Sequence, residues 1–229
     1  MESQTVEETF ALGDEQVEKL EAFCAVDELA ARLFEKTLDD DAAAHIAQLG
    51  CDAEDDFILS SEAAREGLSR MVAFCSEASP ETMARAKADF HKLFVGPQKL
   101  PSPPWGSVYL DRRGMLFGPS EQKVQDFMER FGLRKASEEH APCDHFAIEL
   151  QFVAELGKRA VAALPEDGQA ARRDLAGATE FMDAYVATWH GRFLGLVEHH
   201  AETAFYQGLA MFARGVIEQQ LAWLRDVAA

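Results

Sequence analysis

The chain has 229 residues, of which 40 are acidic and 22 basic, so its formal net charge is −18. A protein that binds nucleic acid needs a basic face, and this composition excludes that class. The longest stretches without a charged side chain are 11 residues (100–110 and 203–213), whereas a membrane span needs roughly 18. Apolar residues make up 48% of the chain, which is enough for a core, and we predict one domain over residues 1–229.

Most of the negative charge lies near the N-terminus, because residues 1–62 hold 18 acidic and 3 basic residues. A solvated face that keeps the protein soluble explains this excess, and attraction for a basic partner is the alternative. The first 12 residues are acidic and the first basic residue is Lys19, so we predict no export signal and a cytoplasmic location. The four cysteines are far apart and predict no disulfide framework.

A helical period runs through most of the chain. Ser79 and Pro80 are typical of a helix start, with the serine as N-cap and the proline in the first turn. Ser120 predicts another start, Gly132 the end of that helix, and Pro142 the start of the next one. The fold class is therefore all-α, a single helical domain of about nine or ten helices. Apolar residues recur at steps of three and four over residues 17–34, 64–75, 83–94, 124–131, 146–164, 175–189 and 205–224.

One long loop, residues 95–119, interrupts this pattern. It holds five of the eight prolines and four glycines, so it cannot form a continuous helix. It also carries Trp105, Tyr109 and several aliphatic residues, which predicts an ordered apolar loop across the helical body. Residues 111–114 favour a short hairpin within it. The loop separates N-terminal helices in residues 1–94 from C-terminal helices in residues 120–229.

The usual catalytic signatures are missing, including a phosphate-binding loop, and we predict no enzyme and no cofactor. His140, Cys143 and His145 lie within six residues and are a possible metal-ligand set, but a helix start does not place them as a tetrahedron. We therefore predict no metal. Asp144 in a first helical turn would keep its charge and accept a bond from an arginine. Trp105 and the proline-rich loop would supply an apolar platform beside it.

Four segments resemble a known family when they are taken in chain order. They are residues 88–97 (ADFHKLFVGP), 103–109 (PPWGSVY), 142–152 (PCDHFAIELQF) and 201–206 (AETAFY). Together they resemble the TorD/DmsD/NarJ family of redox-enzyme maturation chaperones, nearer its TorD/DmsD branch. The resemblance spans residues 60–229. The family often has an acid directly before the motif proline, where this chain has Ala141, with Glu138 and Glu139 nearby.

The resemblance implies an all-α cytoplasmic chaperone. Such proteins bind the twin-arginine leader peptide, and often the body, of the precursor of a molybdopterin oxidoreductase, and they hold back its export until the molybdenum cofactor is inserted. The resemblance does not name the client or decide between monomer and homodimer. The signal-peptide-binding residues that it implies here, with Tyr109 added from the loop, are Leu93, Phe94, Pro104, Trp105, Tyr109, Pro142, Asp144 and His145.

Other interpretations stay open at this stage. Leu93 and Phe94 also fit a helix face that packs in the core, and Tyr109 also fits a plug that fastens the loop to the core. A guanine-nucleotide-binding regulatory protein is a second interpretation of the chain, since such binding has been proposed within the family. A metal-binding helical protein that uses His140, Cys143 and His145 is the third.

Overall fold

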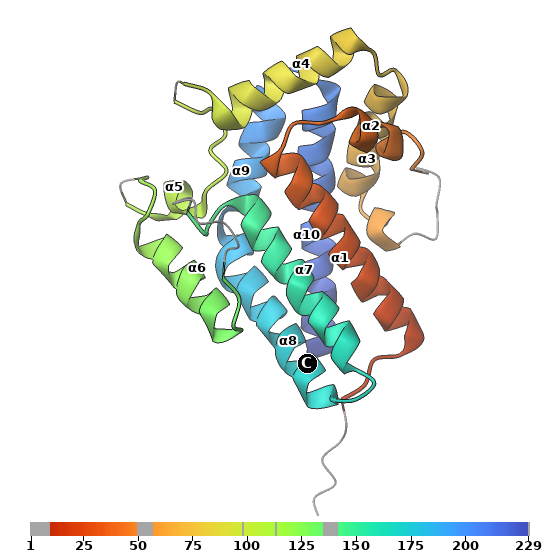
Figure 1. The fold of residues 1–229 in the computed structure, drawn as a ribbon, viewed down its shortest axis with the longest axis vertical. Coiled ribbons are helices and arrows are strands. Elements are labelled where there is room, and N and C mark those ends of the chain that lie inside the picture. Colours follow the sequence, from red (N-terminus) through yellow and green to blue (C-terminus); the bar gives the residue numbers. More distant parts are fainter. Residues whose placement is uncertain (1–9, 50–56, 98, 113, 135–141, 229) are drawn as a thin grey trace, which may run out of the picture.

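The computed structural model describes residues 10–49, 57–97, 99–112, 114–134 and 142–228. Within these ranges no β-strand is present, so the all-α prediction is confirmed (Figure 1). The α-helices are α1 (Asp14–Glu35), α2 (Asp40–Ile46), α3 (Glu62–Ser76), α4 (Pro80–Phe90), α5 (Gly106–Leu110), α6 (Pro119–Arg130), α7 (Phe146–Ala163), α8 (Gly168–Phe181), α9 (Ala187–His200) and α10 (Ala204–Ala228). A 3₁₀ turn (Phe57–Leu59) and two π-helical segments (His91–Val95 and Met182–Val186) complete the described elements.

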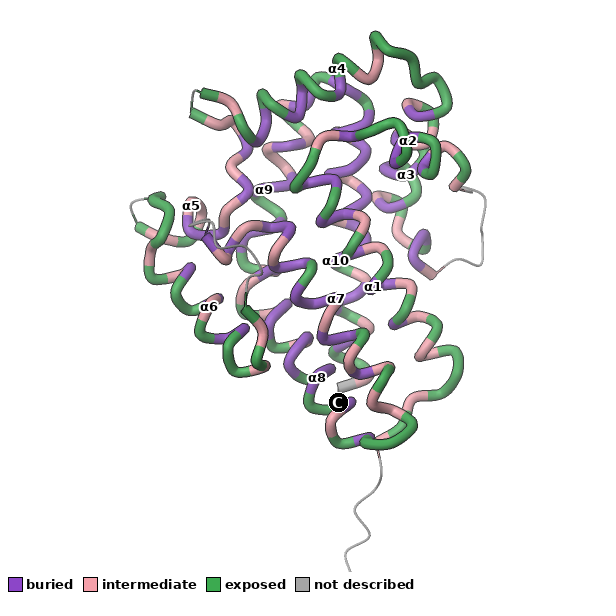
Figure 2. Tube along the Cα trace, viewed as in Figure 1, coloured by how far each residue is buried: buried purple, intermediate pink, exposed green. Residues whose placement is uncertain are grey.

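The long helices pack side by side around one apolar core. Helix α10 packs on α3, α8 and α9, while α7 packs between α1 and α8 (Figure 1). Helices from both sides of the loop at 95–119 therefore share the same core, and their buried faces turn inward in Figure 2. Among the described residues, no helix combines the length and the apolar character needed to cross a bilayer.

The sequence signals for helix ends are partly correct. Ser79 caps α4 by accepting a hydrogen bond from the backbone N–H of Thr82, with Pro80 at the first helical position, as predicted. Gly132 ends α6 in a left-handed conformation (φ +68°), which is also as predicted. The predicted cap at Ser120 is wrong, because α6 begins one residue earlier, at Pro119, behind Gly118.

Two further predictions are corrected in the loop region. Pro142 does not open a helix: α7 begins at Phe146, and the side chain of His145 caps it by accepting from the backbone N–H of Ala147. The hairpin predicted at residues 111–114 is absent from the described residues, where the chain instead passes from the short helix α5 into a turn. The apolar residues before this turn therefore follow a helical rather than an extended path.

An aromatic cluster fills the core beneath this region. The Phe34 ring contacts Phe146 (5.0 Å between centroids), Phe193 (5.5 Å) and Phe94 (5.9 Å). The Trp189 ring adds edge contact with Phe146 at 5.7 Å. Because these rings come from α1, α7, α9 and the π-helical segment after α4, they fix the floor on which the loop lies.

Two glycines allow α3 and α10 to approach closely. A Cβ atom at Gly67 would lie 2.3 Å from the backbone nitrogen of Phe212, and one at Gly208 would lie 2.6 Å from the carbonyl oxygen of Gly67. Backbone atoms at such distances cannot yield as a flexible side chain can. The contact between the two helices therefore requires glycine at both positions.

We expect Gly67→Ala to lower the free energy of unfolding by about 1–3 kcal/mol, because the added methyl group overpacks the α3–α10 contact. Gly191→Ala is the matched control, since that helical glycine has nothing within 4 Å of its would-be Cβ. The control should stabilise the protein by about 0.5–1 kcal/mol. Urea unfolding measures both, and equal effects of the two substitutions would contradict the proposed close approach.

A buried carboxyl group links α1 to α10. The side-chain amide of Gln220 donates a 2.7 Å hydrogen bond to Asp27 Oδ2, and Asp27 is 2% exposed. Burial raises the pKa of Asp27 from 3.8 to about 8, against the opposing effect of the Gln220 bond. The folded protein therefore retains a proton between about pH 4 and pH 8 that the unfolded chain has released.

We expect the free energy of unfolding to fall as the pH rises from 4 to 8. Folded Asp27 binds its proton more tightly than unfolded Asp27 does, and this contribution to stability is lost as the pH reaches the pKa of the folded state. Asp27→Asn keeps the acceptor for Gln220 and should reduce this fall by on the order of 5 kcal/mol. Denaturant unfolding across this range tests the effect. A variant whose pH profile runs parallel to that of the wild type would show that Asp27 is ionised in the fold.

Candidate functional site

Two predicted motif segments lie against each other although almost 40 residues separate them in the sequence. Trp105 and His145 form an isolated antiparallel bridge. The backbone N–H of Gly106 donates to the carbonyl of Asp144 (2.9 Å), and that of Phe146 donates to the carbonyl of Pro104 (2.8 Å). The pairing places the proline-rich loop directly beside the N-terminus of α7.

The Trp105 and His145 side chains face each other across this bridge. Their rings are 5.6 Å apart and nearly perpendicular (78°), and both residues are half-buried. His145 Nδ1 accepts the N–H of Ala147, so the neutral imidazole carries its proton on Nε2. Trp105 Nε1 is buried and has no hydrogen-bond partner in the described part of the chain. The pair offers an aromatic surface at the start of α7.

Asp144 is not the open carboxylate that the sequence predicts. It precedes α7 and is only 1% exposed, and its Oδ2 atom accepts the backbone N–H of Ser107 at 2.5 Å. Asp144 thereby caps the short helix α5 from a distant part of the chain. Burial raises the pKa of Asp144, while hydrogen bonds from Ser107 oppose the shift. Asp144 Oδ1 has no partner among the described residues.

Two more carboxyl groups lie buried near Asp144. Glu149 Oε2 accepts the indole N–H of Trp189 at 3.1 Å, and Glu121 Oε1 accepts the backbone N–H of Cys143 at 3.1 Å. Burial holds the pKa of Glu149 well above its usual range, and the charge of Asp144 adds to the shift. Sequence reasoning missed this role, although Glu149 stands on the apolar face of its predicted helix, which is a usable signal.

Tyr109 fastens the loop to the core. Its hydroxyl donates to the carbonyl of Pro103 at 2.8 Å, and its ring stacks on Trp189 at 5.4 Å. Arg192 covers the outer face of the ring (5.3 Å to the centroid) and donates to the Tyr109 carbonyl. These contacts match the alternative in which Tyr109 acts as a plug.

The other predicted site residues are buried. Leu93 is 0% and Phe94 4% exposed, so both belong to the core, which was the alternative left open for them. Pro104 and Pro142 are also buried and shape the two paired segments. Of the eight predicted residues, only Trp105, Tyr109 and His145 keep part of their surface accessible.

Exposed apolar surface is concentrated in the loop. Every large hydrophobic residue that is exposed in the described chain lies in the segment 95–117, and the most exposed is Phe117, at 60%. Phe117 has a φ of +59°, which a non-glycine residue adopts at a cost. Both carboxylate oxygens of Asp111 accept the N–H of Ser120, at 3.3 and 3.4 Å, and so tie the ends of this turn together. The remaining members are Val95, Leu110, Met115 and Leu116.

Comparison with known proteins covers the part of the chain that holds this site. Residues 59–195 match the family model described as the nitrate reductase delta subunit, and this stretch contains both paired segments. The chain is 33% identical to the Tat proofreading chaperone DmsD of Salmonella typhi over 159 residues, which cover 69% of this chain and 70% of that protein. It belongs to the TorD/DmsD/NarJ family.

Further relatives cover an equal or larger share of the chain. The chaperone protein TorD of Shewanella pealeana is 28% identical over 190 residues, which cover 79% of this chain and 75% of the relative. The DmsD of Salmonella typhimurium is 34% identical over 160 residues, or 69% and 70% of the two chains. A crystal structure from Archaeoglobus fulgidus aligns with 91% of this chain and 98% of its own at 15% identity and a TM-score of 0.49.

The alternative interpretations gain no support from these findings. None of the names of these relatives refers to a nucleotide or to a metal. His140, from the predicted metal-ligand set, lies outside the described residues, as do Glu138, Glu139 and Ala141. In the ranges that the structure describes, no three His, Cys, Asp or Glu side chains gather so that they could hold a metal ion.

We expect Asp144→Ala to lower the free energy of unfolding by about 1–3 kcal/mol, because the N–H of Ser107 loses its acceptor in a buried place. Asp144→Asn keeps an oxygen acceptor and should cost less than about 1 kcal/mol. Urea unfolding at neutral pH compares the two variants. If both were as stable as the wild type, the capping role assigned to Asp144 would be wrong.

Proposed function

We propose that this protein is a maturation chaperone that binds the twin-arginine leader, and also the incompletely folded body, of a molybdopterin oxidoreductase precursor in the cytoplasm. Membership of the family and the names of the relatives, Tat proofreading chaperone DmsD and chaperone protein TorD, support this proposal. Its activity is binding rather than catalysis. The bound chaperone would hold back export until the molybdenum cofactor has been inserted.

The observation that carries the proposal is the pairing of the two motif segments beside an exposed apolar loop. A twin-arginine leader has two arginines followed by an apolar stretch, so its receptor needs an apolar surface. The half-buried Trp105 ring and the exposed side chains of Leu116 and Phe117 belong to one loop, and this loop is bonded to α7 at His145. The apolar part of a leader would find its contacts there.

The surface around Trp105 is ready for binding before the peptide arrives. Backbone hydrogen bonds on both sides of Trp105, from Gly106 and to Pro104, fix the position of its ring. The prolines stiffen the chain, and the Tyr109 plug prevents the loop from lifting. A preformed surface pays little conformational entropy on binding, which favours affinity for a flexible peptide.

The strong negative charge of the chain supports a cationic partner. A net charge of −18 attracts a peptide with two arginines over a distance and raises its rate of association. This attraction is screened as salt increases, since the Debye length is about 8 Å near physiological ionic strength. Apolar contacts with the loop remain at high salt, so a part of the affinity should be insensitive to it.

We expect Trp105→Ala to weaken the binding of a fluorescent twin-arginine leader peptide about tenfold or more, because an aromatic anchor in a preformed site is lost. Fluorescence polarisation measures the dissociation constant, and circular dichroism checks the fold of each variant. Trp223→Phe is the control, since Trp223 lies on α10 against Phe23 and away from the loop.

Two negative results would have different meanings. If the wild-type protein did not bind the leader, the proposed function would fail. If the wild type bound it and Trp105→Ala bound equally well, the function would stand and the assignment of Trp105 to the site would fail.

A further inference from the structure

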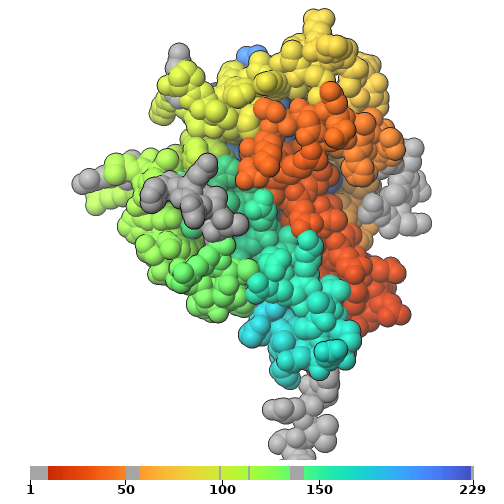
Figure 3. Space-filling model, in the orientation of Figure 1, coloured from red at the N-terminus to blue at the C-terminus, as the bar shows by residue number. Residues whose placement is uncertain are grey.

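An apolar groove runs between the C-terminal end of α6 and the outer face of α7. Two adjoining hollows of about 230 and 180 Å³ share Met128, Leu133 and Arg134 as lining residues. Ile148 and Phe152 continue the apolar floor along α7. Cys143 lines the other end, only two residues before His145, so the groove begins beside the paired motif segments. Figure 3 shows α6 and α7 next to each other on one face of the molecule.

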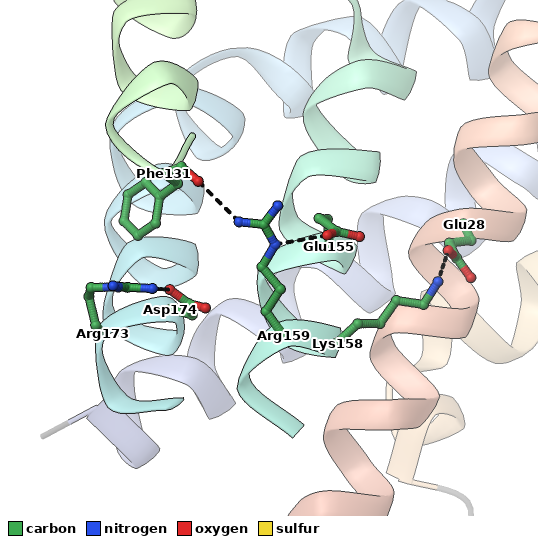
Figure 4. Close-up of polar contacts among 7 residues, drawn as sticks. All are labelled: Glu28, Phe131, Glu155, Lys158, Arg159, Arg173 and Asp174. Atoms are coloured by element: carbon green, nitrogen blue, oxygen red, sulfur yellow. Dashed lines mark hydrogen bonds and ion pairs between the residues drawn. The ribbon is translucent and has the colours of Figure 1, made fainter. Parts of the chain in front are cut away.

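At the end of the groove away from Cys143, an arginine of α7 holds the two helices together. Arg159 donates to Glu155 Oε1 at 2.8 Å and to the carbonyl of Phe131 at 3.0 Å, as Figure 4 shows. This bond holds the end of α6 against α7. Beyond it the chain turns at Gly132, where the N–H of Leu133 bonds back to the carbonyl of Met128. Hydrogen bonds therefore hold both walls of the groove in place, α7 on one side and the end of α6 on the other.

Exposed carboxylates stand beside this apolar floor. The side chains of Glu129 on α6 and Glu155 on α7 are 39% and 45% exposed. Glu129 also forms an ion pair with Arg134 at 3.6 Å, but the Arg134 side chain is 80% exposed. A pair so open to solvent contributes little stability and exchanges easily with another cation. The groove thus already holds an arginine of this chain loosely against one of its acids.

We infer that this groove receives an arginine of the leader peptide and that Arg134 occupies its place at Glu129 when no leader is bound. The inference rests on the proposed function and names the part of the surface that takes the positive charge. Asp144 cannot serve as the open acceptor because it is 1% exposed and bonded to Ser107.

Charge and shape both favour an arginine as the occupant. A guanidinium group stacks on apolar surface and forms forked hydrogen bonds to a carboxylate. The compact ammonium group of lysine does not stack in this way, and it binds a carboxylate less well because it lacks the fork. The groove supplies the apolar floor at Met128 and Phe152 and the carboxylates at Glu129 and Glu155. Since the groove starts near His145, an extended peptide would reach it from the apolar loop without leaving the surface.

The test uses two substitutions with opposite expected signs and the twin-arginine leader peptide as probe. Glu129→Gln should weaken binding about threefold or more, because an acceptor for the arginine is lost. Arg134→Ala should strengthen binding about twofold or more, because the competing cation is removed. The same peptide with two lysines should bind more weakly than the arginine peptide to the wild type, and this difference should shrink in Glu129→Gln.

Each variant has a control that makes the same change in net charge elsewhere. Glu77→Gln removes an exposed acid at the end of α3, and Arg65→Ala removes an exposed base on that helix. If binding responded only to the net charge of the chain, each control would behave like its partner variant, and the inference would be overturned. We expect both controls to bind as the wild type does.

The remaining outcomes are also decisive. Unchanged affinity in both Glu129→Gln and Arg134→Ala, with normal leader binding by the wild type, would overturn the groove and leave the proposed function standing. No binding by the wild type would overturn the function itself. If light scattering showed that the protein dimerises and that the groove variants abolish dimerisation rather than peptide binding, the occupant would be a second copy of this chain and the inference would be wrong.

Discussion

The backbone pairing of residues 104–106 with residues 144–146 is the constraint on which the rest of the site depends. A segment with five prolines cannot form one continuous helix, and where it lies against the core outside the short helix α5, unpaired N–H and C=O groups would be costly. The segment before α7 supplies the missing partners through the bonds at Pro104 and Gly106. The same bonds orient Trp105 and His145. The hydrogen bonds that the backbone needs are therefore also the ones that form the aromatic surface.

Buried aspartates accept hydrogen bonds from free backbone N–H groups at the start of two helices in this fold. Asp144 accepts the N–H of Ser107 at the start of α5, and Asp89 on α4 accepts the backbone N–H and the hydroxyl of Thr203 just before α10. In each case a carboxylate from a distant element satisfies the free N–H groups at the N-terminus of a helix. Both aspartates belong to segments that carry the family resemblance, so a residue in such a motif can hold the architecture without touching a ligand.

The sequence predicts a feature well when neighbouring residues determine it, and poorly when a partner far along the chain determines it. The helical periods and the N-cap of α4 at Ser79 are local, and local rules predicted them correctly. The burial of Asp144 depends on a partner 37 residues away, and the start of α7 at Phe146 rather than Pro142 depends on the same pairing. No local pattern contains that information. The apolar residues of the loop were identified from the sequence, but their exposure at 115–117 follows only from the folded turn that Asp111 closes.

A receptor for a cationic and apolar peptide must present its two kinds of surface in different ways. Apolar side chains can bind a ligand whether or not they are in contact with water before it arrives. A carboxylate that is sealed in the core has its charged form disfavoured, as the raised pKa values of Asp144 and Glu149 show. Such groups cannot also attract an arginine from solvent. A partly exposed carboxylate such as Glu129 can be reached from solvent, although solvent weakens each of its contacts. The fold therefore separates the buried acids that hold the loop in place from the exposed acids that remain available to a ligand.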